Sequence, residues 1–436
     1  MPQTSNDLFE GQDFGNFFCD DACDSAHEPD TLPVSKTNGE SASRSGSPAF
    51  SNSNPVRVLL VNNSADVYGA SRSLLRLAGR LEELGHEAVV LLPETGPLDE
   101  RLRSAGIQTV IFPSLRVITR PVLASWRILP WLAGFLPSAI ALSRLIREKK
   151  IDIVHTNTGV IVSSALAARF AGRPHVWHIR DWFQEFGPLW KPYSRYILAN
   201  ADRVLCVSGA IAGQFPRSDH IEVLNNGFDL DEFPEPTPEE RARARERWNI
   251  SPGCLVVGTV GRIKFKRKGQ EFLLKAVKLL RERGIDTTCL LAGGPAPGAE
   301  EQIAQMEELA AGLGVPTIFT GELPNARPAY AAMDIFVLPS AQPEPFGGVV
   351  MEAMALGLPV IGTNIGGTVE QIADGETGFL VPPADPAAMA EAIAKLAVDS
   401  ARCCNMGSNG RRRISEKFNI RAMTARIIAV YESVMR

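Results

Sequence analysis

Long apolar runs are missing from this sequence of 436 residues. The apolar, uncharged stretch Ile128 to Ser143 has sixteen residues and two prolines, fewer than the roughly 20 that a membrane-spanning helix needs. The N-terminus is acidic and has no apolar core segment, so we expect no signal peptide. We therefore expect a cytoplasmic protein without a membrane span.

Cysteines are few, and their number is odd. The chain has seven, and Cys206, Cys254 and Cys289 stand in apolar, strand-like runs. This pattern indicates reduced thiols in a protein core and not a disulfide framework. Cys19 and Cys23 lie four residues apart in an acidic segment, but too few further ligands accompany them to predict a metal site.

Strong net charge is also absent. The value of −4 argues neither for nor against a nucleic-acid partner, and we expect none. The distribution is more informative, because residues 1–55 contain nine acidic and two basic residues and are rich in Ser, Asn, Asp and Gly. So little apolar surface cannot offset the entropy of ordering, and we expect residues 1–55 to be a disordered acidic tail.

Short β-branched runs alternate with helical patterns from Val56 onward. The first series contains VRVLLVN, EAVVLLP, DIVHTN, HVWHIR and RVLCVS. After the polar stretch DLDEFPEPTPEERARARERWNISPG, the second contains CLVVGTVGR, TTCLLAGG, DIFVLPS and PVIGTN. Apolar strands alternating with amphipathic helices predict parallel sheets covered on both faces. Two consecutive doubly wound α/β domains are the simplest architecture, with ligands at the carboxyl ends of the strands.

A basic, aromatic stretch lies in the first domain. Between Gln108 and Lys150 there are seven basic residues and one acidic residue, interleaved with Trp126, Trp131 and Phe135. One interpretation is a crossover helix that packs on the sheet with a solvated basic end. The other is a peripheral contact of residues 116–150 with an anionic membrane.

Two glutamates eight residues apart, Glu344 and Glu352, occur in PEPFGGVVMEAMALGLPV. Paired carboxylates suggest a glycosidase, but a loop followed by a helix turn does not place them across one glycosidic bond at ~5–9 Å. They suit two positions on one elongated ligand, since a carboxylate binds a vicinal diol. The glycines Gly347 and Gly348 precede a helix, whose N-terminus is a ready site for phosphate.

These segments together resemble the retaining glycosyltransferases of family 4, whose GT-B fold has two Rossmann-like doubly wound α/β domains facing a central cleft. The resemblance covers residues 56–436. PEPFGGVVME has the spacing of the family's two glutamates, VGRIKFKRKGQEFLLKA is similar to its diphosphate-binding loop, and NNGFDLDEF to its interdomain link. It implies an acceptor domain over 56–228, a donor domain over 229–415, and a C-terminal helix over 416–436 that packs back toward the N-terminal domain.

The resemblance implies roles for residues of the donor side. Glu344 and the backbone of Phe346, Gly347 and Gly348 would hold hydroxyl groups of the donor sugar, and Glu352 would hold the ribose diol. The donor is a nucleotide-diphosphate sugar in this family, and no metal or other cofactor is implied.

The resemblance also implies which residues would bind the diphosphate of the donor. Arg262, after the turn at Gly261, and Lys268 would face it, and Gly69 would let it pack beneath the first N-terminal helix. The spacing from Arg262 to Lys268 is one residue longer than expected, so Lys266 is an alternative source of the ammonium group. Glu344, Arg262 and Lys268 are the expected catalytic residues.

On the acceptor side, DIVHTNTGV and HVWHIRD resemble segments that line the cleft. The candidates they contain are His155, Asn157, His178 and Arg180. Histidines on apolar strands are as often hydrogen-bonded core residues, so both interpretations stay open.

The sequence thus predicts a retaining glycosyltransferase acting on a glycan or lipid-linked acceptor in cell-surface polysaccharide or glycolipid biosynthesis, at the inner face of the membrane. Two alternatives remain: a GT-B-fold nucleotide-sugar epimerase, and a catalytically silent nucleotide-sugar-binding protein. Intact Glu344, Glu352 and Arg262 argue against the silent protein.

Overall fold

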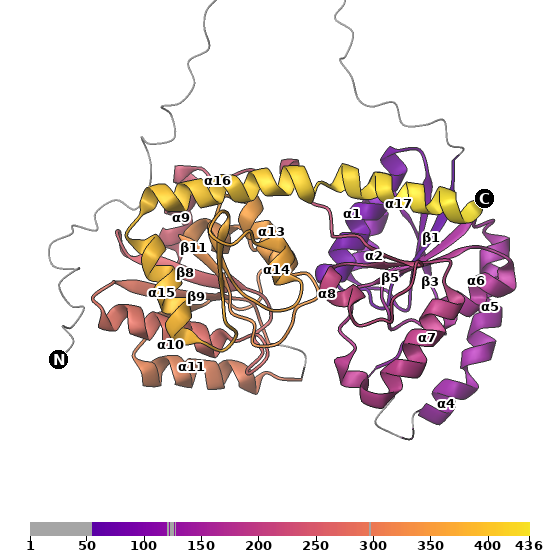
Figure 1. Cartoon of the computed structure of the whole chain (residues 1–436), viewed down its shortest axis with the longest axis horizontal. Helices are drawn as coiled ribbons and strands as arrows, with labels where there is room; N and C mark the ends of the chain where they lie inside the picture. Colours follow the sequence, from indigo (N-terminus) through magenta and orange to yellow (C-terminus); the bar gives the residue numbers. More distant parts are fainter. Residues whose placement is uncertain (1–54, 120–121, 123–125, 127, 296–297) are drawn as a thin grey trace, which may run out of the picture.

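The computed structural model describes residues 55–436, apart from 120–121, 123–125, 127 and 296–297. The predicted disordered tail, with Cys19 and Cys23, lies outside the described residues except for Pro55. The described chain forms two lobes, each built around one parallel sheet with helices on both faces (Figure 1).

The N-terminal lobe contains a seven-stranded sheet in the order β3-β2-β1-β4-β5-β6-β7. Its strands are β1 (Arg57–Val61), β2 (Glu87–Leu92), β3 (Gln108–Ile111), β4 (Ile153–Thr156), β5 (His175–Ile179), β6 (Arg203–Cys206) and β7 (Ile221–Val223). Its helices are α1 (Gly69–Glu83), α2 (Pro97–Ser104), α4 (Ile128–Ala133), α5 (Phe135–Glu148), α6 (Ser163–Ala171), α7 (Trp190–Asn200), α8 (Gly209–Ala212) and the 3-10 turn η1 (Gln184–Leu189).

The C-terminal lobe contains a six-stranded sheet in the order β10-β9-β8-β11-β12-β13. Its strands are β8 (Leu255–Val260), β9 (Thr287–Ala292), β10 (Thr317–Phe319), β11 (Ile335–Leu338), β12 (Val360–Thr363) and β13 (Gly378–Val381). Its helices are α9 (Pro238–Arg247), α10 (Gln270–Glu282), α11 (Glu301–Leu313), α12 (Arg327–Ala332), α13 (Gly348–Ala355), α14 (Thr368–Gln371), α15 (Pro386–Ala397) and α16 (Ser400–Lys417).

Both sheets are doubly wound, as predicted. The winding direction reverses between β1 and β4 in the first sheet and between β8 and β11 in the second. Ligands of such sheets bind outside the carboxyl ends of the strands at this reversal. The segments that follow β1, β4, β8 and β11 begin at Asn62, Asn157, Gly261 and Pro339, so the predicted site residues cluster where the topology places a ligand.

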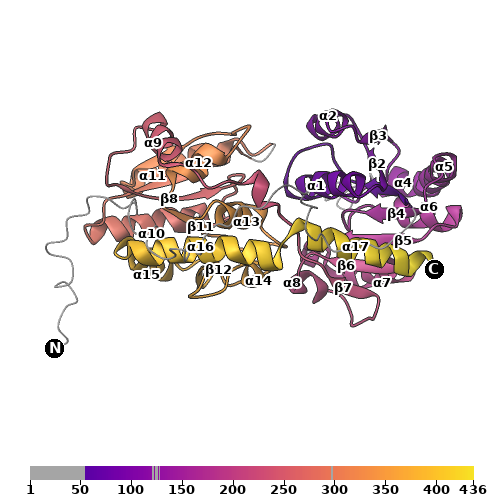
Figure 2. The same cartoon turned by 90° about the horizontal axis from the view of Figure 1, so that it is seen from above.

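The last two helices connect the lobes. In Figures 1 and 2, α16 runs over the C-terminal lobe, and α17 (Ile420–Met435) continues over the N-terminal lobe. Ile427 and Tyr431 of α17 are buried in one core cluster with Val58 and Leu60 of β1. A helix at the end of the chain thus completes the core of the first lobe, and the boundaries at 228 and 415 remain proposals.

The two crossings between the lobes are hydrogen-bonded to each other. The short turn η2 (Leu230–Glu232) follows the first crossing, and the second lies between α16 and α17. Phe228 N–H donates to Phe418 O at 2.7 Å, and Ile420 N–H donates to Phe228 O at 3.0 Å. Any movement of one lobe against the other therefore bends both crossings together.

The uncharged stretch of residues 128–143 is largely helical. It forms α4 and most of α5, and Pro130 and Pro137 stand in the first turns of these helices, where proline is tolerated. The prolines therefore do not shorten the helical segment. Ile128–Glu148 is long and apolar enough to be a candidate membrane span, and 22% of its apolar window is buried in the molecule; one such helix is weak evidence for a span.

Candidate active site

Glu344 lies in the loop after β11. Its carboxylate accepts hydrogen bonds from the Lys268 ammonium at 2.7 Å and from the Ser340 hydroxyl at 2.9 Å. Burial raises the pKa of this carboxyl, but the charge and hydrogen bond of Lys268 outweigh burial and hold the pKa below its ordinary value. Glu344 is therefore an ionised group with a lysine at its side.

The backbone of this loop is fixed by the segment after β12. Gly367 N–H donates to Glu344 O at 2.8 Å, and a Cβ atom on Gly366 would lie 2.5 Å from the same oxygen. Only glycine permits this approach, and Gly366 also has a positive φ of 60°. Pro343 and Pro345 restrict the loop further, so its conformation is set both locally and by tertiary contact.

The start of α13 opens onto the cleft. Gly347 is the N-cap residue, and the side-chain amide of Gln371 binds its backbone twice. Gln371 Nε2 donates to Gly347 O at 2.8 Å, and Gly347 N–H donates to Gln371 Oε1 at 3.2 Å. Gly348 has open space where a Cβ would be, and Phe346 packs its ring against Phe418. The first N–H groups of α13 are therefore presented without a side-chain cap, as an anion site requires.

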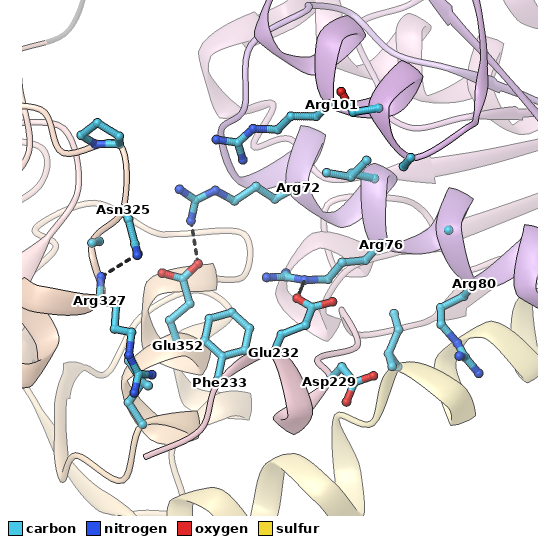
Figure 3. Close-up of a pocket in the computed structure, with 18 of the residues that line it drawn as sticks. Arg72, Arg76, Arg80, Arg101, Asp229, Glu232, Phe233, Asn325, Arg327 and Glu352 are labelled. Carbon is cyan, nitrogen blue, oxygen red and sulfur yellow. Dashed lines mark hydrogen bonds and ion pairs between the residues drawn. The ribbon is translucent and has the colours of Figure 1, made fainter. Parts of the chain in front are cut away.

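Glu352 is buried one turn into α13 and contacts both lobes. Its carboxylate accepts a hydrogen bond from Tyr330 Oη at 3.0 Å and forms an ion pair with Arg72 of α1 at 2.8 Å. Figure 3 shows Arg72 reaching across from the N-terminal lobe. Burial, together with the neighbouring carboxylate, raises the pKa of Tyr330 well above its ordinary value, so its hydroxyl remains a donor.

Arg262 follows β8 and also contacts the opposite lobe. Its guanidinium carbon lies 3.4 Å from the centre of the Tyr68 ring, and Tyr68 Oη donates to Glu322 at 3.1 Å. Gly261 has φ 145°, a conformation that favours glycine, and its carbonyl oxygen lies where a Cβ on Gly293 would be. The tight turn predicted at Gly261 is therefore present, and it directs Arg262 into the cleft.

The two lysines predicted for the diphosphate differ in position. Lys268 is partly buried and paired with Glu344, whereas Lys266 is exposed and has a positive φ of 63°. Lys268 is therefore the better placed of the two toward the cleft.

Polar groups of the N-terminal lobe meet around Arg180, which is 8% exposed. Its Nε donates to Asn157 Oδ1 at 2.9 Å, one terminal nitrogen donates to Asn226 Oδ1, and the other lies 3.2 Å from His178 Nδ1. Ser73 of α1 also donates to Asn226, at 2.9 Å. Gly69 stands at the uncapped start of the same helix.

His155 and His178 are fully buried beneath this cluster. His155 Nδ1 lies 2.7 Å from Tyr431 Oη of α17, and the two imidazole rings are 5.4 Å apart. Burial, aided by the charge of Arg180, lowers the pKa of His155 to about 3. The same causes lower the pKa of His178 well below its ordinary value. Both rings are neutral core groups here.

A cavity of about 120 Å³ brings several predicted residues together. It lies between the start of α1 and the start of α13, and the predicted residues that line it are Gly69, Arg180, Phe346, Gly348 and Glu352. Arg262, Lys268 and Glu344 are not among its lining residues, and neither are the buried side chains of His155, Asn157 and His178. Of the acceptor-side candidates, only Arg180 reaches the cavity.

A larger cavity of about 830 Å³ adjoins Glu352 from the other side (Figure 3). Arg72, Arg76 and Arg80 of α1 line it, and Arg76 forms an ion pair with Glu232 at 3.1 Å. We did not predict these arginines from the sequence. Their spacing of four residues is a usable signal, because it places them on one face of a helix that begins at the cleft. In the described residues, no group of three or more potential metal ligands is present.

Two family models match the chain, one to each lobe. Residues 67–232 match the family described as "Glycosyltransferase Family 4", and residues 254–399 match "Glycosyl transferases group 1". A GDP-mannose-dependent alpha-(1-6)-phosphatidylinositol monomannoside mannosyltransferase of Mycolicibacterium smegmatis is 31% identical over 367 residues, 78% of this chain and 89% of the relative. The lipopolysaccharide core mannosyltransferase LpsB of Rhizobium meliloti is 31% identical over 56% of this chain and 69% of its own length.

Solved structures confirm the fold. HepE of Anabaena, crystallised with UDP and glucose, superposes with a TM-score of 0.74 at 23% identity, over 86% of this chain and 99% of HepE. WaaG, a glycosyltransferase of lipopolysaccharide biosynthesis, gives a TM-score of 0.61 at 17% identity, over 87% of this chain and 99% of its own. The two family models and the relative from Mycolicibacterium smegmatis show that the chain belongs to the group 1 glycosyltransferases of family 4 and is a glycosyltransferase with the GT-B fold.

Proposed function

We propose that the enzyme transfers a sugar, with retention of configuration, from a nucleotide-diphosphate sugar to a hydroxyl group of a glycan or lipid-linked acceptor. The observation that carries this proposal is the cavity between α1 and α13, because both lobes contribute to it. The uncapped starts of two helices and Arg180 face one small space that Glu352 closes. Donor and acceptor groups from opposite lobes would meet there.

In this proposal the residues divide the donor between them. Glu352 accepts the ribose hydroxyls, and Glu344 with the backbone at Gly348 holds the sugar hydroxyls. Arg262 and Lys268 stabilise the diphosphate as negative charge develops on it during departure. The diphosphate oxygen takes the acceptor proton, so the enzyme provides positive charge and position and does not act as a nucleophile.

The contacts across the cleft have a consequence for binding. Arg72 pairs with Glu352 and Tyr68 covers Arg262 across the cleft, whereas Lys268 pairs with Glu344 within the C-terminal lobe. A donor that uses these groups must replace or share these contacts. We therefore propose that donor binding and a small movement of the lobes are linked.

A donor screen tests the proposed reaction. The full chain is incubated with UDP-, GDP- and ADP-linked hexoses, and free nucleotide and the anomeric configuration of the product are followed by phosphorus and proton NMR. Nucleotide release with a retained anomer is expected, and it should continue in EDTA because no metal is proposed. An inverted product would contradict retention, loss of turnover in EDTA would contradict metal independence, and reversible formation of an epimer would contradict transfer.

The relatives suggest the class of acceptor. One acts on a phosphatidylinositol monomannoside and another in the lipopolysaccharide core, according to their names. We therefore propose an acceptor in cell-surface glycolipid or polysaccharide biosynthesis, reached at the cytoplasmic face of the membrane.

Exposed apolar residues on α4, α5 and the segment before them support such a location. Trp126, Leu129, Leu132 and Leu136 are between 50% and 75% exposed. The other side of α5 is packed in the core, where Leu142 is fully buried, so the helix cannot leave the domain without breaking it. We therefore propose that α4 and the start of α5 rest on an anionic membrane and do not span it.

Vesicle flotation tests the membrane contact. The chain should float with vesicles containing anionic lipid, and Leu129→Glu should weaken this binding. Val398→Glu is the matched control, because Val398 is 49% exposed on the other lobe. Equal flotation of both variants, or absence of the wild-type chain from the vesicle fraction at low and high salt, would reject the contact.

A further inference from the structure

Arg180 is a buried cation with neutral partners. It follows β5, lines the cavity between α1 and α13, and is 8% exposed. Its three hydrogen-bond partners are the side chains of Asn157, Asn226 and His178. Burial lowers the pKa of His178 well below its ordinary value, so this ring is neutral at physiological pH and accepts through Nδ1.

No carboxylate among the described residues forms an ion pair with Arg180. Asp181 is next in the chain and offsets part of the charge, but its own carboxylate accepts from the Thr158 hydroxyl at 2.8 Å and from Gly159 N–H at 2.6 Å. Burial without full compensation lowers the pKa of Arg180 to about 9. An arginine has five N–H donors, and these contacts use three, which leaves two for a ligand.

The rest of the cavity wall adds positive charge. Arg72 and Arg76 also line it, but they are paired with Glu352 and Glu232, so the added positive charge is the partial charge of the uncapped starts of α1 and α13. Glu352 is the one carboxylate in the wall that the structure describes, and Arg72 already neutralises it. A cavity of about 120 Å³ with this wall has room for a small anionic group and the charge to bind it.

We propose that Arg180 is the counter-ion for a carboxylate or phosphate group carried by one of the two sugars that the enzyme joins. This inference rests on the proposed function, because the backbone at Gly348, which lines this cavity, then holds the donor sugar. The anion has two sources. One is the transferred sugar, as the C6 carboxylate of a uronic acid, and the other is an acid group of the acceptor.

A structural role alone explains Arg180 less well. Burying a charged group is costly unless an opposite charge accompanies it, whereas a neutral side chain could satisfy Asn157 and Asn226 without that cost. The unsatisfied charge faces the cavity and not the core. A ligand anion supplies the compensation that the described residues lack.

The donor arm of the test measures binding of matched nucleotide sugars to the full chain by calorimetry. UDP-glucuronate is compared with UDP-glucose, and GDP-mannuronate with GDP-mannose. If the anion belongs to the donor, one acidic ligand binds about tenfold or more tightly than its neutral partner, because charge-assisted hydrogen bonds are the strong ones. Arg180→Met should remove this preference, and Arg180→Lys should keep part of it.

The acceptor arm uses the chain saturated with UDP or GDP. Glucose 6-phosphate and glucuronate are titrated against glucose, and binding of an anion that Arg180→Met abolishes supports the acceptor as the source. Arg169→Met is the control, since Arg169 is an exposed arginine on α6 of the same lobe. The ratio of the Kd values for the acidic and the neutral ligand is taken within each variant, so it does not depend on what fraction of that variant is folded.

The outcomes separate this inference from the proposed function. If neutral nucleotide sugars bind but neither arm shows a preference for an anion that depends on Arg180, the inference is refuted and the proposed donor site is unaffected. An anion preference that survives in Arg180→Met also refutes it. If no nucleotide sugar binds to the wild-type chain, the proposed donor site fails first, and the inference fails with it.

Discussion

Glu352→Gln is the most direct test of the donor site, because the structure separates its effect on binding from its effect on stability. The variant keeps the size of the side chain, and its amide oxygen can accept the hydrogen bond from Tyr330 Oη that is 3.0 Å long in the wild-type structure. It removes the ion pair with Arg72, whose side chain is 37% exposed. Glu352 is only 6% exposed, so the variant loses the attraction of Arg72 but also avoids burying a charge, and the free energy of unfolding should change by no more than about 1 kcal/mol.

Nucleotide binding should suffer more. Hydrogen bonds from the ribose hydroxyls to a carboxylate are worth about 1.5–3 kcal/mol each, against about 0.5–1.5 kcal/mol for neutral bonds. The ribose must also compete with Arg72 for Glu352, which lowers the net gain in the wild-type enzyme. The difference is about 1–1.5 kcal/mol for each hydrogen bond. We therefore expect a loss equivalent to one bond, about 1.4 kcal/mol, which is a tenfold higher Kd for UDP or GDP.

Isothermal titration of the full chain with UDP and GDP measures the Kd, and urea unfolding measures the stability. Glu87→Gln is the control, because Glu87 is a 61% exposed glutamate that pairs with Arg57 far from the cleft. Wild-type affinity in Glu352→Gln would refute the assignment of the ribose to Glu352. An equal loss of affinity in Glu87→Gln would show a general charge effect instead.

Three further predictions follow. Burial lowers the pKa of His155 to about 3 and of His175 to about 4, so below about pH 6.5 the unfolded chain binds protons that the folded chain excludes. The free energy of unfolding should therefore fall between pH 7 and pH 5 in urea titrations, and a flat or rising profile would contradict this. Glu344→Ala should abolish nucleotide release and cost about 1–3 kcal/mol of stability, since it strands the half-buried Lys268; wild-type turnover would refute the site. Lys268→Met should lower kcat/KM for the donor more than Lys266→Met does, and the opposite ranking would favour Lys266 as the diphosphate ligand.

The sequence by itself determined the architecture and the donor loop. Apolar strands alternating with amphipathic helices specify doubly wound sheets, because a parallel sheet must be covered on both faces. The turn at Gly261, a helix beginning next to Gly348 and a stiff segment at Glu344 were predictable from neighbouring residues, although tertiary contacts with Gly366 and Gly367 complete the loop at Glu344. The prolines Pro130 and Pro137 did not show where the helices run, because proline in a first helical turn does not end the helix.

Only the tertiary structure decided which groups meet across the cleft. The ion pair between Arg72 and Glu352 joins residues 280 positions apart, and no local pattern sets the distance between them. The same holds for His155, which the structure places against Tyr431 of the last helix, and for Arg180, whose charge is buried among amides. Periodicity specifies the direction of a side chain on its own helix or strand, whereas the packing of the two lobes specifies what that side chain faces.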